Sequence, residues 1–162
     1  MKTSPRTPRH AAVSALRAAA VVLAAAIAAP AAFAQASDTP VGLWKNIDDE
    51  TKQAKSLIRI LEKDGVLTGR VEKILTDKPD AKCDKCTDER KDQPVQGMTI
   101  LRGIKPDAGD KGTWVGGDIL DPNNGKIYKV LIKLADGGKK LDVRGYIGMP
   151  MLGRTQTWLR VE

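Results

Sequence analysis

From Val41 onward the sequence is a series of short segments rich in β-branched and aromatic residues, which alternate with glycine, asparagine and aspartate. Such segments are typical of successive β-strands joined by turns. No stretch of a dozen residues shows the sustained apolar spacing of a helix. The pattern therefore predicts an all-β domain, with strands over residues 41–47, 55–62, 66–75, 113–120, 126–134, 141–148 and 152–161, and a strand or a helical turn over 96–104.

The connections between these segments favour neighbouring antiparallel strands. Asp64-Gly65 supplies the positive φ that a tight hairpin turn needs. Thr76 to Pro94 is the exception, a long charged loop of the kind that is usually functional or disordered. An open sheet of seven or eight strands would expose its edges, whereas closure removes them. We therefore expect an up-and-down antiparallel β-barrel, with a two-sheet β-sandwich as the alternative.

The first 34 residues have the plan of a secretory signal peptide: a basic end, an apolar run over residues 18–29, and Ala32-Phe33-Ala34 as a small-residue cleavage site. The apolar run is shorter than the ~20 residues that span a bilayer. Cleavage would leave one soluble domain over residues 35–162. The basic residues of the leader are Lys2, Arg6, Arg9 and Arg17.

Removal of this leader changes the charge and the chemistry. The whole chain has 27 basic and 20 acidic residues and a formal charge of +7, but four basic residues and no acidic one lie in the leader, so the mature charge is +3. This small, interspersed excess argues against a nucleic-acid partner. His10, the one histidine, leaves too, which excludes Ser-His-Asp and Cys-His catalysis and imidazole metal sites in the mature domain.

Cys83 and Cys86 form a C-x-x-C motif within the charged loop. A zinc site needs about four ligands, and this chain has neither a mature histidine nor a third cysteine. A redox-active pair of the thioredoxin type opens a helix, and no strong helical pattern follows here. The expectation is a local disulfide formed in an oxidising compartment, with no metal or cofactor.

The two C-terminal segments place polar groups at alternating positions. Arg144 and Tyr146 share one face of their predicted strand, because side chains alternate with period two. If these faces point into the barrel, they form a site for a carboxylate or another anionic head group; if they point outward, they are a solvated surface. The sequence leaves the direction open. The next strand shares a face among Arg154, Gln156, Trp158 and Arg160.

Trp44 and Trp158 lie near the two ends of the predicted domain. In a closed meander the first and last strands are neighbours, so Arg160 could lie across a tryptophan ring and seal the barrel end. Such a cation–π contact is worth ~0.5 to 2 kcal/mol. This set is expected to be structural.

Several motifs together resemble the secreted bacterial proteins grouped as domain of unknown function 2147. The resemblance covers essentially the whole mature chain and is most specific at residues 152–160. It implies a lipocalin-like (calycin) barrel exported by Gram-negative bacteria, and no established reaction. The motifs are Gly42-x-Trp44, Ile58-Arg59-Ile60, Gly65-x-Leu67-x-Gly69-Arg70, the cysteine pair, Gly116-Gly117-x-Ile119-Leu120-Asp121-Pro122, Gly125-Lys126-x-Tyr128, Arg144-Gly145-Tyr146-x-Gly148 and Leu152-Gly153-Arg154-Thr155-Gln156-x-Trp158-x-Arg160.

These observations predict a periplasmic binding module whose barrel holds a small amphipathic or anionic molecule. The alternative is an envelope protein-interaction or maintenance domain with a solid core, which binds through the loop from Thr76 to Pro94. An enzyme is not expected, because no paired catalytic groups emerge. The candidate ligand-binding residues are Arg144, Tyr146, Arg154, Gln156 and Tyr128.

Overall fold

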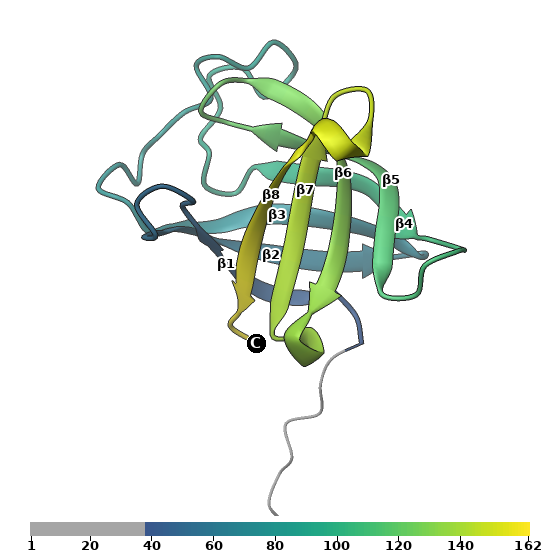
Figure 1. The fold of residues 1–162 in the computed structure, drawn as a ribbon. Coiled ribbons are helices and arrows are strands. Elements are labelled where there is room, and N and C mark those ends of the chain that lie inside the picture. The colour runs from purple at the N-terminus through teal and green to yellow at the C-terminus, as the bar shows by residue number, and fades with distance from the viewer. Residues whose placement is uncertain (1–37) are drawn as a thin grey trace, which may run out of the picture. The chain divides into compact units, whose positions relative to one another are not determined.

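The computed structural model describes residues 38–162 as an antiparallel barrel (Figure 1). The predicted signal peptide lies outside these described residues. Within residues 38–162, no helix is long and apolar enough to cross a bilayer. The strands are β1 (Gly42–Ile47), β2 (Ala54–Lys63), β3 (Val66–Ile74), β4 (Thr99–Pro106), β5 (Thr113–Asp121), β6 (Lys126–Ala135), β7 (Lys140–Tyr146) and β8 (Arg154–Arg160), with short 3₁₀ turns η1 (Asp136–Gly138) and η2 (Pro150–Leu152).

Each strand pairs with the next one along the chain, and β8 pairs with β1 to close the barrel. The closing pairs are Trp44 with Arg160 and Lys45 with Leu159. The predicted up-and-down barrel is confirmed, and the two-sheet sandwich is not the fold. Of the strand and the helical turn predicted for residues 96–104, the strand is the one that forms, and it begins at Thr99.

The last predicted strand is shorter than expected. The sequence pattern continues from Leu152, but residues 150–152 form η2, and β8 starts at Arg154. Pro150 stands at the start of this turn, where its fixed φ fits and its missing N–H is not needed. The β7–β8 connection is therefore a folded loop and not a tight hairpin.

Period-two alternation directs apolar side chains into the barrel. Ile58 and Ile60 on β2, and Leu141 and Val143 on β7, are almost fully buried. Trp158 on β8 faces Leu141 across the strand pair. Each fully buried side chain of this size contributes ~1.5 to 3 kcal/mol relative to an exposed one. The other large, fully buried side chains include Trp44, Leu67, Leu101, Ile104, Leu120, Val130 and Ile132.

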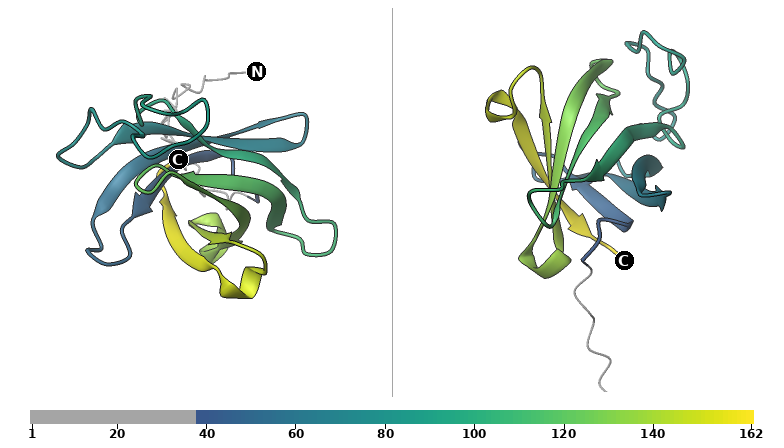
Figure 2. Two further views of the ribbon diagram at one scale, coloured as in Figure 1. Left: turned by 90° about the horizontal axis from the view of Figure 1, so that it is seen from above. Right: turned by 90° about the vertical axis from the view of Figure 1, so that its right-hand side faces the viewer.

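The barrel has two unlike ends, visible in the views of Figure 2. At the end where the C-terminus lies, which we call the capped end, the Arg160 guanidinium sits 4.1 Å from the centroid of the Trp44 ring. The same guanidinium donates hydrogen bonds to the carbonyl oxygens of Gly138 (2.6 Å), Val41 (2.9 Å) and Thr39 (2.7 Å). Burial lowers the pKa of Arg160. The opposite, open end carries the β1–β2, β3–β4, β5–β6 and β7–β8 connections.

Candidate functional site

A pocket of about 690 Å³ lies at the open end of the barrel, within the range typical of small-molecule sites. Strands β1, β2, β3, β4, β5, β6, β7 and β8 all contribute to its lining, and so do the loops at that end. Its innermost part is apolar, because the inward positions of the strands continue the core. The apolar lining includes Trp158, Val143, Val71, Ile100 and Ile119.

Above this apolar part, polar side chains lie on the same inward face. Asn46 on β1 pairs with Ser56 on β2, and Gln156 on β8 pairs with Val143 on β7. All of these residues line the pocket. We call Asn46, Ser56, Gln156 and Tyr128 the polar collar.

Two polar atoms of the pocket lining have no hydrogen-bond partner among the residues that the structure describes. They are the Oδ1 atom of Asn46, an acceptor, and the Nε1 atom of Trp158, a donor. Both atoms are buried, and a buried polar group without a partner costs about 1 to 3 kcal/mol. Such groups are rare in folded proteins and mark sites of function, bound water or strain.

The rim of the pocket carries charges of both signs, and several are paired. Lys55 lies 3.2 Å from the Asp48 carboxylate, and the Arg154 Nε atom lies 2.8 Å from Asp49. The backbone N–H and hydroxyl of Thr51, with Lys55, hold the pKa of Asp48 well below its usual range. The rim therefore has no cationic excess to attract an anion. Its acidic lining residues are Asp48, Glu50, Asp84 and Asp121, and its basic ones are Lys55, Lys82 and Arg154.

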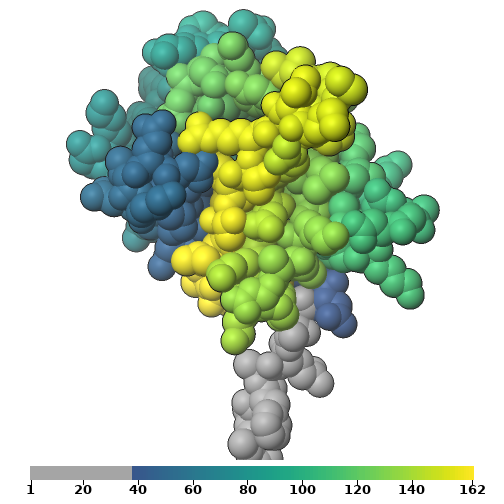
Figure 3. Space-filling view, in the orientation of Figure 1, coloured from purple at the N-terminus to yellow at the C-terminus, as the bar shows by residue number. Residues whose placement is uncertain are grey.

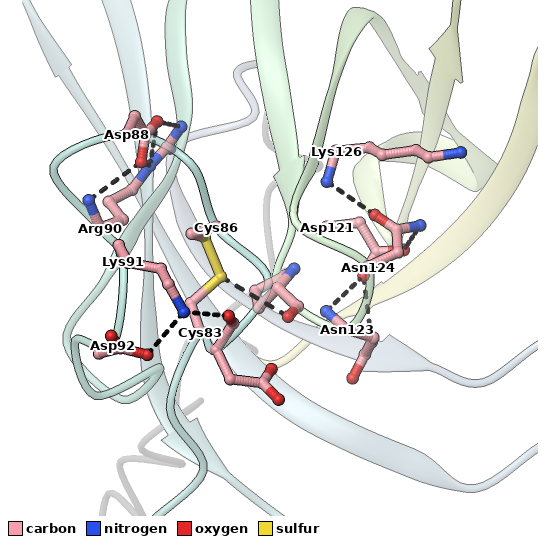
Figure 4. The surroundings of a disulfide bond; sticks show 12 residues. Cys83, Cys86, Asp88, Arg90, Lys91, Asp92, Asp121, Asn123, Asn124 and Lys126 are labelled. Carbon is pink, nitrogen blue, oxygen red and sulfur yellow. Dashed lines mark hydrogen bonds and ion pairs between the residues drawn. A yellow bond between two sulfur atoms is a disulfide. The ribbon is translucent and has the colours of Figure 1, made fainter.

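The disulfide between Cys83 and Cys86 lies in the long loop over the open end (Figure 4). Both cysteines are buried with the core cluster. The Sγ atom of Cys83 lies 3.6 Å from the carbonyl oxygen of Pro122 in the β5–β6 turn. The expected local disulfide is thus present and is packed against the barrel. Within residues 38–162, no group of three or more His, Cys, Asp or Glu side chains is arranged to hold a metal ion.

The long loop is folded and held at several points. Residues Lys82 and Pro94 form an isolated β-bridge. Arg90, which is 5% exposed, donates to the carbonyl oxygen of Thr99 at 3.1 Å and to the carboxylate of Asp88. The hydrogen bond from Arg90 lowers the pKa of Asp88 to about 2. The loop thus forms part of the pocket wall through Ala81, Lys82, Asp84 and Val95.

Gly125 shows how closely this loop approaches the β5–β6 turn. A Cβ atom at Gly125 would lie 1.9 Å from the carbonyl oxygen of Lys85, and its φ is +70°. No side chain fits there, and glycine also adopts this φ without steric cost. The glycine in this motif therefore serves the contact between the turn and the disulfide loop.

The predicted site residues separate into two groups. Arg154, Gln156 and Tyr128 line the pocket. Arg144 and Tyr146 do not line it, because Leu141 and Val143 occupy the inward positions of β7 and the alternate residues face outward. The polar face of β8 therefore points into the barrel, whereas the face of β7 that carries Arg144 and Tyr146 points outward. The predicted role of Arg144 and Tyr146 in gripping a ligand inside the barrel is therefore set aside.

Arg144 has a different set of partners. Its guanidinium donates to the carbonyl oxygens of Pro150 (2.6 Å) and Met151 (3.0 Å) and to the Thr155 hydroxyl (2.7 Å). Arg144 thus fixes the β7–β8 connection on the outside of the barrel. The third predicted set, Trp44, Trp158 and Arg160, lies on the inner face, with Trp44 and Arg160 in contact at the capped end.

Sequence reasoning missed Asn46, Ser56 and Arg90. Asn46 and Ser56 carried a usable signal, since each stands at an inward position of a strand that otherwise alternates apolar residues. Arg90 carried no such sequence signal, because it lies within a charged loop and only the tertiary contact with Thr99 buries it.

Comparison with known proteins agrees with this architecture. A protein from Helicobacter pylori, HP1028, described as belonging to the lipocalin family, has a similar structure with a TM-score of 0.67 and 17% sequence identity, over 78% of this chain and 85% of that one. This likeness shows the fold. No curated protein matches the sequence significantly. The sequence pattern of the uncharacterized proteins conserved in bacteria known as DUF2147 matches residues 42–160, and the chain belongs to this family.

Proposed function

We propose that this protein is a periplasmic binding module that holds a small amphipathic molecule in the open end of its barrel. The observation that carries the proposal is the pocket of about 690 Å³, which is apolar inside and polar at its collar. A molecule with an apolar body and a polar end matches this order. The unpartnered atoms of Asn46 and Trp158 support a ligand that both donates and accepts hydrogen bonds.

The charges of the rim favour a neutral or zwitterionic polar end over an anionic one. Four acidic and three basic side chains line the pocket. Two of the basic ones, Lys55 and Arg154, are already paired with Asp48 and Asp49. An anionic ligand would have to compete with these carboxylates for the same cations.

The same features support binding over catalysis and over a purely structural role. Two basic groups at the rim, Lys55 and Arg154, are held in ion pairs with Asp48 and Asp49, which favours a binding role over acid–base catalysis. The alternative of an interaction domain required a solid interior, and the pocket favours the binding role over it.

The periplasmic location is supported by the disulfide between Cys83 and Cys86 and by the bacterial family. Disulfides persist in oxidising compartments and are rare in the cytosol. Expression of the full chain in a Gram-negative host, followed by intact mass measurement of the periplasmic fraction, tests this part. We expect a product that begins at Gln35; an uncleaved cytosolic product would contradict it.

Native mass spectrometry of protein purified from its own cells tests ligand binding directly, because a co-purified molecule adds its mass to the protein. Two fluorescent probes test the charge preference. N-phenylnaphthylamine is neutral and carries one N–H donor, whereas anilinonaphthalene sulfonate is an anion. We expect the neutral probe to bind more tightly. Tighter binding of the anion would contradict the neutral polar end.

Gly145→Val tests the location of the site. A Cβ at Gly145 would lie 3.5 Å from the Tyr128 Cβ atom, an ordinary contact, so a valine would fill the pocket without backbone strain. We expect probe affinity to fall by roughly tenfold or more, because the apolar contact area of the probe is lost. The matched control is Lys129→Val on the exposed outer face of β6, which should leave affinity unchanged. Equal losses in both variants would place the probe elsewhere.

A further inference from the structure

The β7–β8 connection carries a concentration of exposed apolar side chains. We call residues 147–152 the β7–β8 tip. Four of its side chains are more than half exposed: Ile147 (68%), Met149 (58%), Met151 (74%) and Leu152 (74%). In the space-filling view, the yellow group at the upper right, which belongs to the β7–β8 connection, projects from the molecule (Figure 3). Single exposed apolar residues are ordinary, but a contiguous group indicates an interaction site.

Hydrogen bonds within the protein hold the backbone of the tip at several points. The N–H of Leu152 donates to the Met149 carbonyl at 3.1 Å, and the N–H of Gly153 donates to the Pro150 carbonyl at 3.0 Å. The Arg144 guanidinium donates to the carbonyl oxygens of Pro150 and Met151. The tip is therefore a held loop in which the carbonyl oxygens of Met149, Pro150 and Met151 are bonded within the protein and the apolar side chains are exposed.

This arrangement matches what a lipid surface requires. The internal hydrogen bonds of the tip carbonyl groups lower the cost of moving the loop out of water, since the bilayer offers few partners. Tyr146 adjoins the tip, and tyrosine is enriched at the level of lipid head groups. Two exposed basic residues lie beside the tip: Arg154 follows it in the chain, and Lys129 on β6 pairs with Tyr146. A basic surround favours anionic lipids.

A folded protein partner fits the tip less well. Stable protein interfaces bury ≈ 800 Å² on each partner, with a polar rim around an apolar centre. Four side chains on one short projecting loop offer much less area than that. Insertion into a lipid surface needs only such a small apolar projection, because each inserted side chain contributes on its own.

We propose that the β7–β8 tip inserts into the head-group region of a bilayer that contains anionic phospholipid. The tip holds the open end of the barrel at the membrane surface. Arg144 is a positioning residue for this contact, since it fixes the loop without meeting the lipid itself. The proposal does not depend on a ligand in the barrel.

Co-sedimentation with vesicles tests the proposal. The vesicles consist of phosphatidylethanolamine with phosphatidylglycerol as the minority anionic lipid. The protein is recovered from the periplasm, so that every variant has the same N-terminus. Met151→Asp combined with Leu152→Asp should lower the partition coefficient by about tenfold or more, because two apolar groups leave the lipid. Circular dichroism and a denaturation curve confirm that the fold is kept.

The matched control adds the same two charges at the capped end, by Leu61→Asp combined with Val161→Asp. These side chains are 52% and 48% exposed, and partition should not change. Equal losses in the two double variants would reduce the effect to charge repulsion and overturn the proposal. Absence of vesicle binding by the wild-type protein would also overturn it. A wild-type dimer that dissociates in the tip variant would overturn it as well, since the tip would then be a protein interface.

A polarity-sensitive fluorophore gives a second readout. Attached at Met151→Cys, it should shift to shorter wavelength when vesicles are added, as its surroundings lose water. The same label at Leu61→Cys should not shift. Arg144→Met should weaken vesicle binding while the tip residues are unchanged. Undiminished vesicle binding by that variant would show that Arg144 does not position the tip.

Discussion

The two ends of the barrel treat polar groups in opposite ways. At the capped end, Arg160 covers the Trp44 ring and donates to three backbone carbonyl oxygens. At the open end, Asn46 Oδ1 and Trp158 Nε1 are buried without partners beside a pocket. Polar groups at the capped end are hydrogen-bonded within the protein, whereas two buried polar atoms at the open end remain able to bond to a bound molecule.

The connections differ in the same sense. At the capped end the strands are joined by short links, such as Asp64-Gly65 between β2 and β3 and η1 between β6 and β7. The open end carries the long disulfide loop and the β7–β8 tip. Under the proposed function, stability and recognition lie at different ends, as in many folds where loops on a rigid scaffold carry function. The following substitutions compare the two ends.

Arg160→Met should give the largest loss of stability. The variant leaves the carbonyl groups of Thr39, Val41 and Gly138 without the guanidinium donor and removes the cation–π contact. We expect the free energy of unfolding to fall by about 3 kcal/mol in urea titrations. The control at the open end is Arg154→Met, which breaks an ion pair whose arginine is 64% exposed and should cost less than about 1 kcal/mol. Similar losses would contradict the special role of the capped end.

Gly125→Ala tests the contact between the β5–β6 turn and the disulfide loop. Its partner is Gly65→Ala at the capped end, where φ is +74° but nothing lies within 4 Å of the new Cβ. Both variants strain a left-handed backbone, so the difference between them isolates the clash with Lys85. We expect Gly125→Ala to cost about 2 kcal/mol more than Gly65→Ala. Equal unfolding midpoints would mean that the disulfide loop moves away from the new Cβ atom without loss of stability.

Replacement of both Cys83 and Cys86 by alanine should cost about 1 to 2 kcal/mol, because the closed loop is short. The effect should be confined to the open end. In amide hydrogen exchange, we expect faster exchange in residues 81–95 and unchanged protection in β1 and β8. Chemical reduction of the wild-type protein should reproduce this pattern. Faster exchange at Trp44 would show that the two ends are coupled.

Asp88→Asn should give the smallest effect, a loss of stability at neutral pH that disappears in acid. Arg90 lowers the pKa of Asp88 from 3.8 to about 2, so the folded protein binds a proton less readily than the unfolded chain. The stabilisation from this carboxylate is therefore complete above about pH 4 and is lost as the pH falls toward 2. The variant should flatten the dependence of stability on pH between these values. An unchanged slope would mean that the ion pair between Asp88 and Arg90 contributes nothing.

Much of the scaffold followed from local sequence, and part of the site did not. The alternation of Ile58 and Ile60, the Asp64-Gly65 turn and the absence of helical periodicity predicted the strands and their order. The pocket residues on β8 were found, because Gln156 and Arg154 share a face with Trp158. The face that carries Arg144 and Tyr146 on β7 points outward, and the sequence could not show this, since alternation shows which side chains share a face but not which face points inward.

The sequence by itself determined a run of antiparallel strands joined by turns, because each strand and turn is specified by residues within a few positions of one another. Closure into a barrel depends on the pairing of β1 with β8, which are far apart in the chain. Only the tertiary structure decided which end would be capped and which would stay open. Arg160 reaches Thr39 and Val41 from the far end of the chain, and the Lys85 backbone approaches Gly125 from a different loop. Contacts between residues so distant in sequence leave no periodic signal, so only the folded chain reveals them.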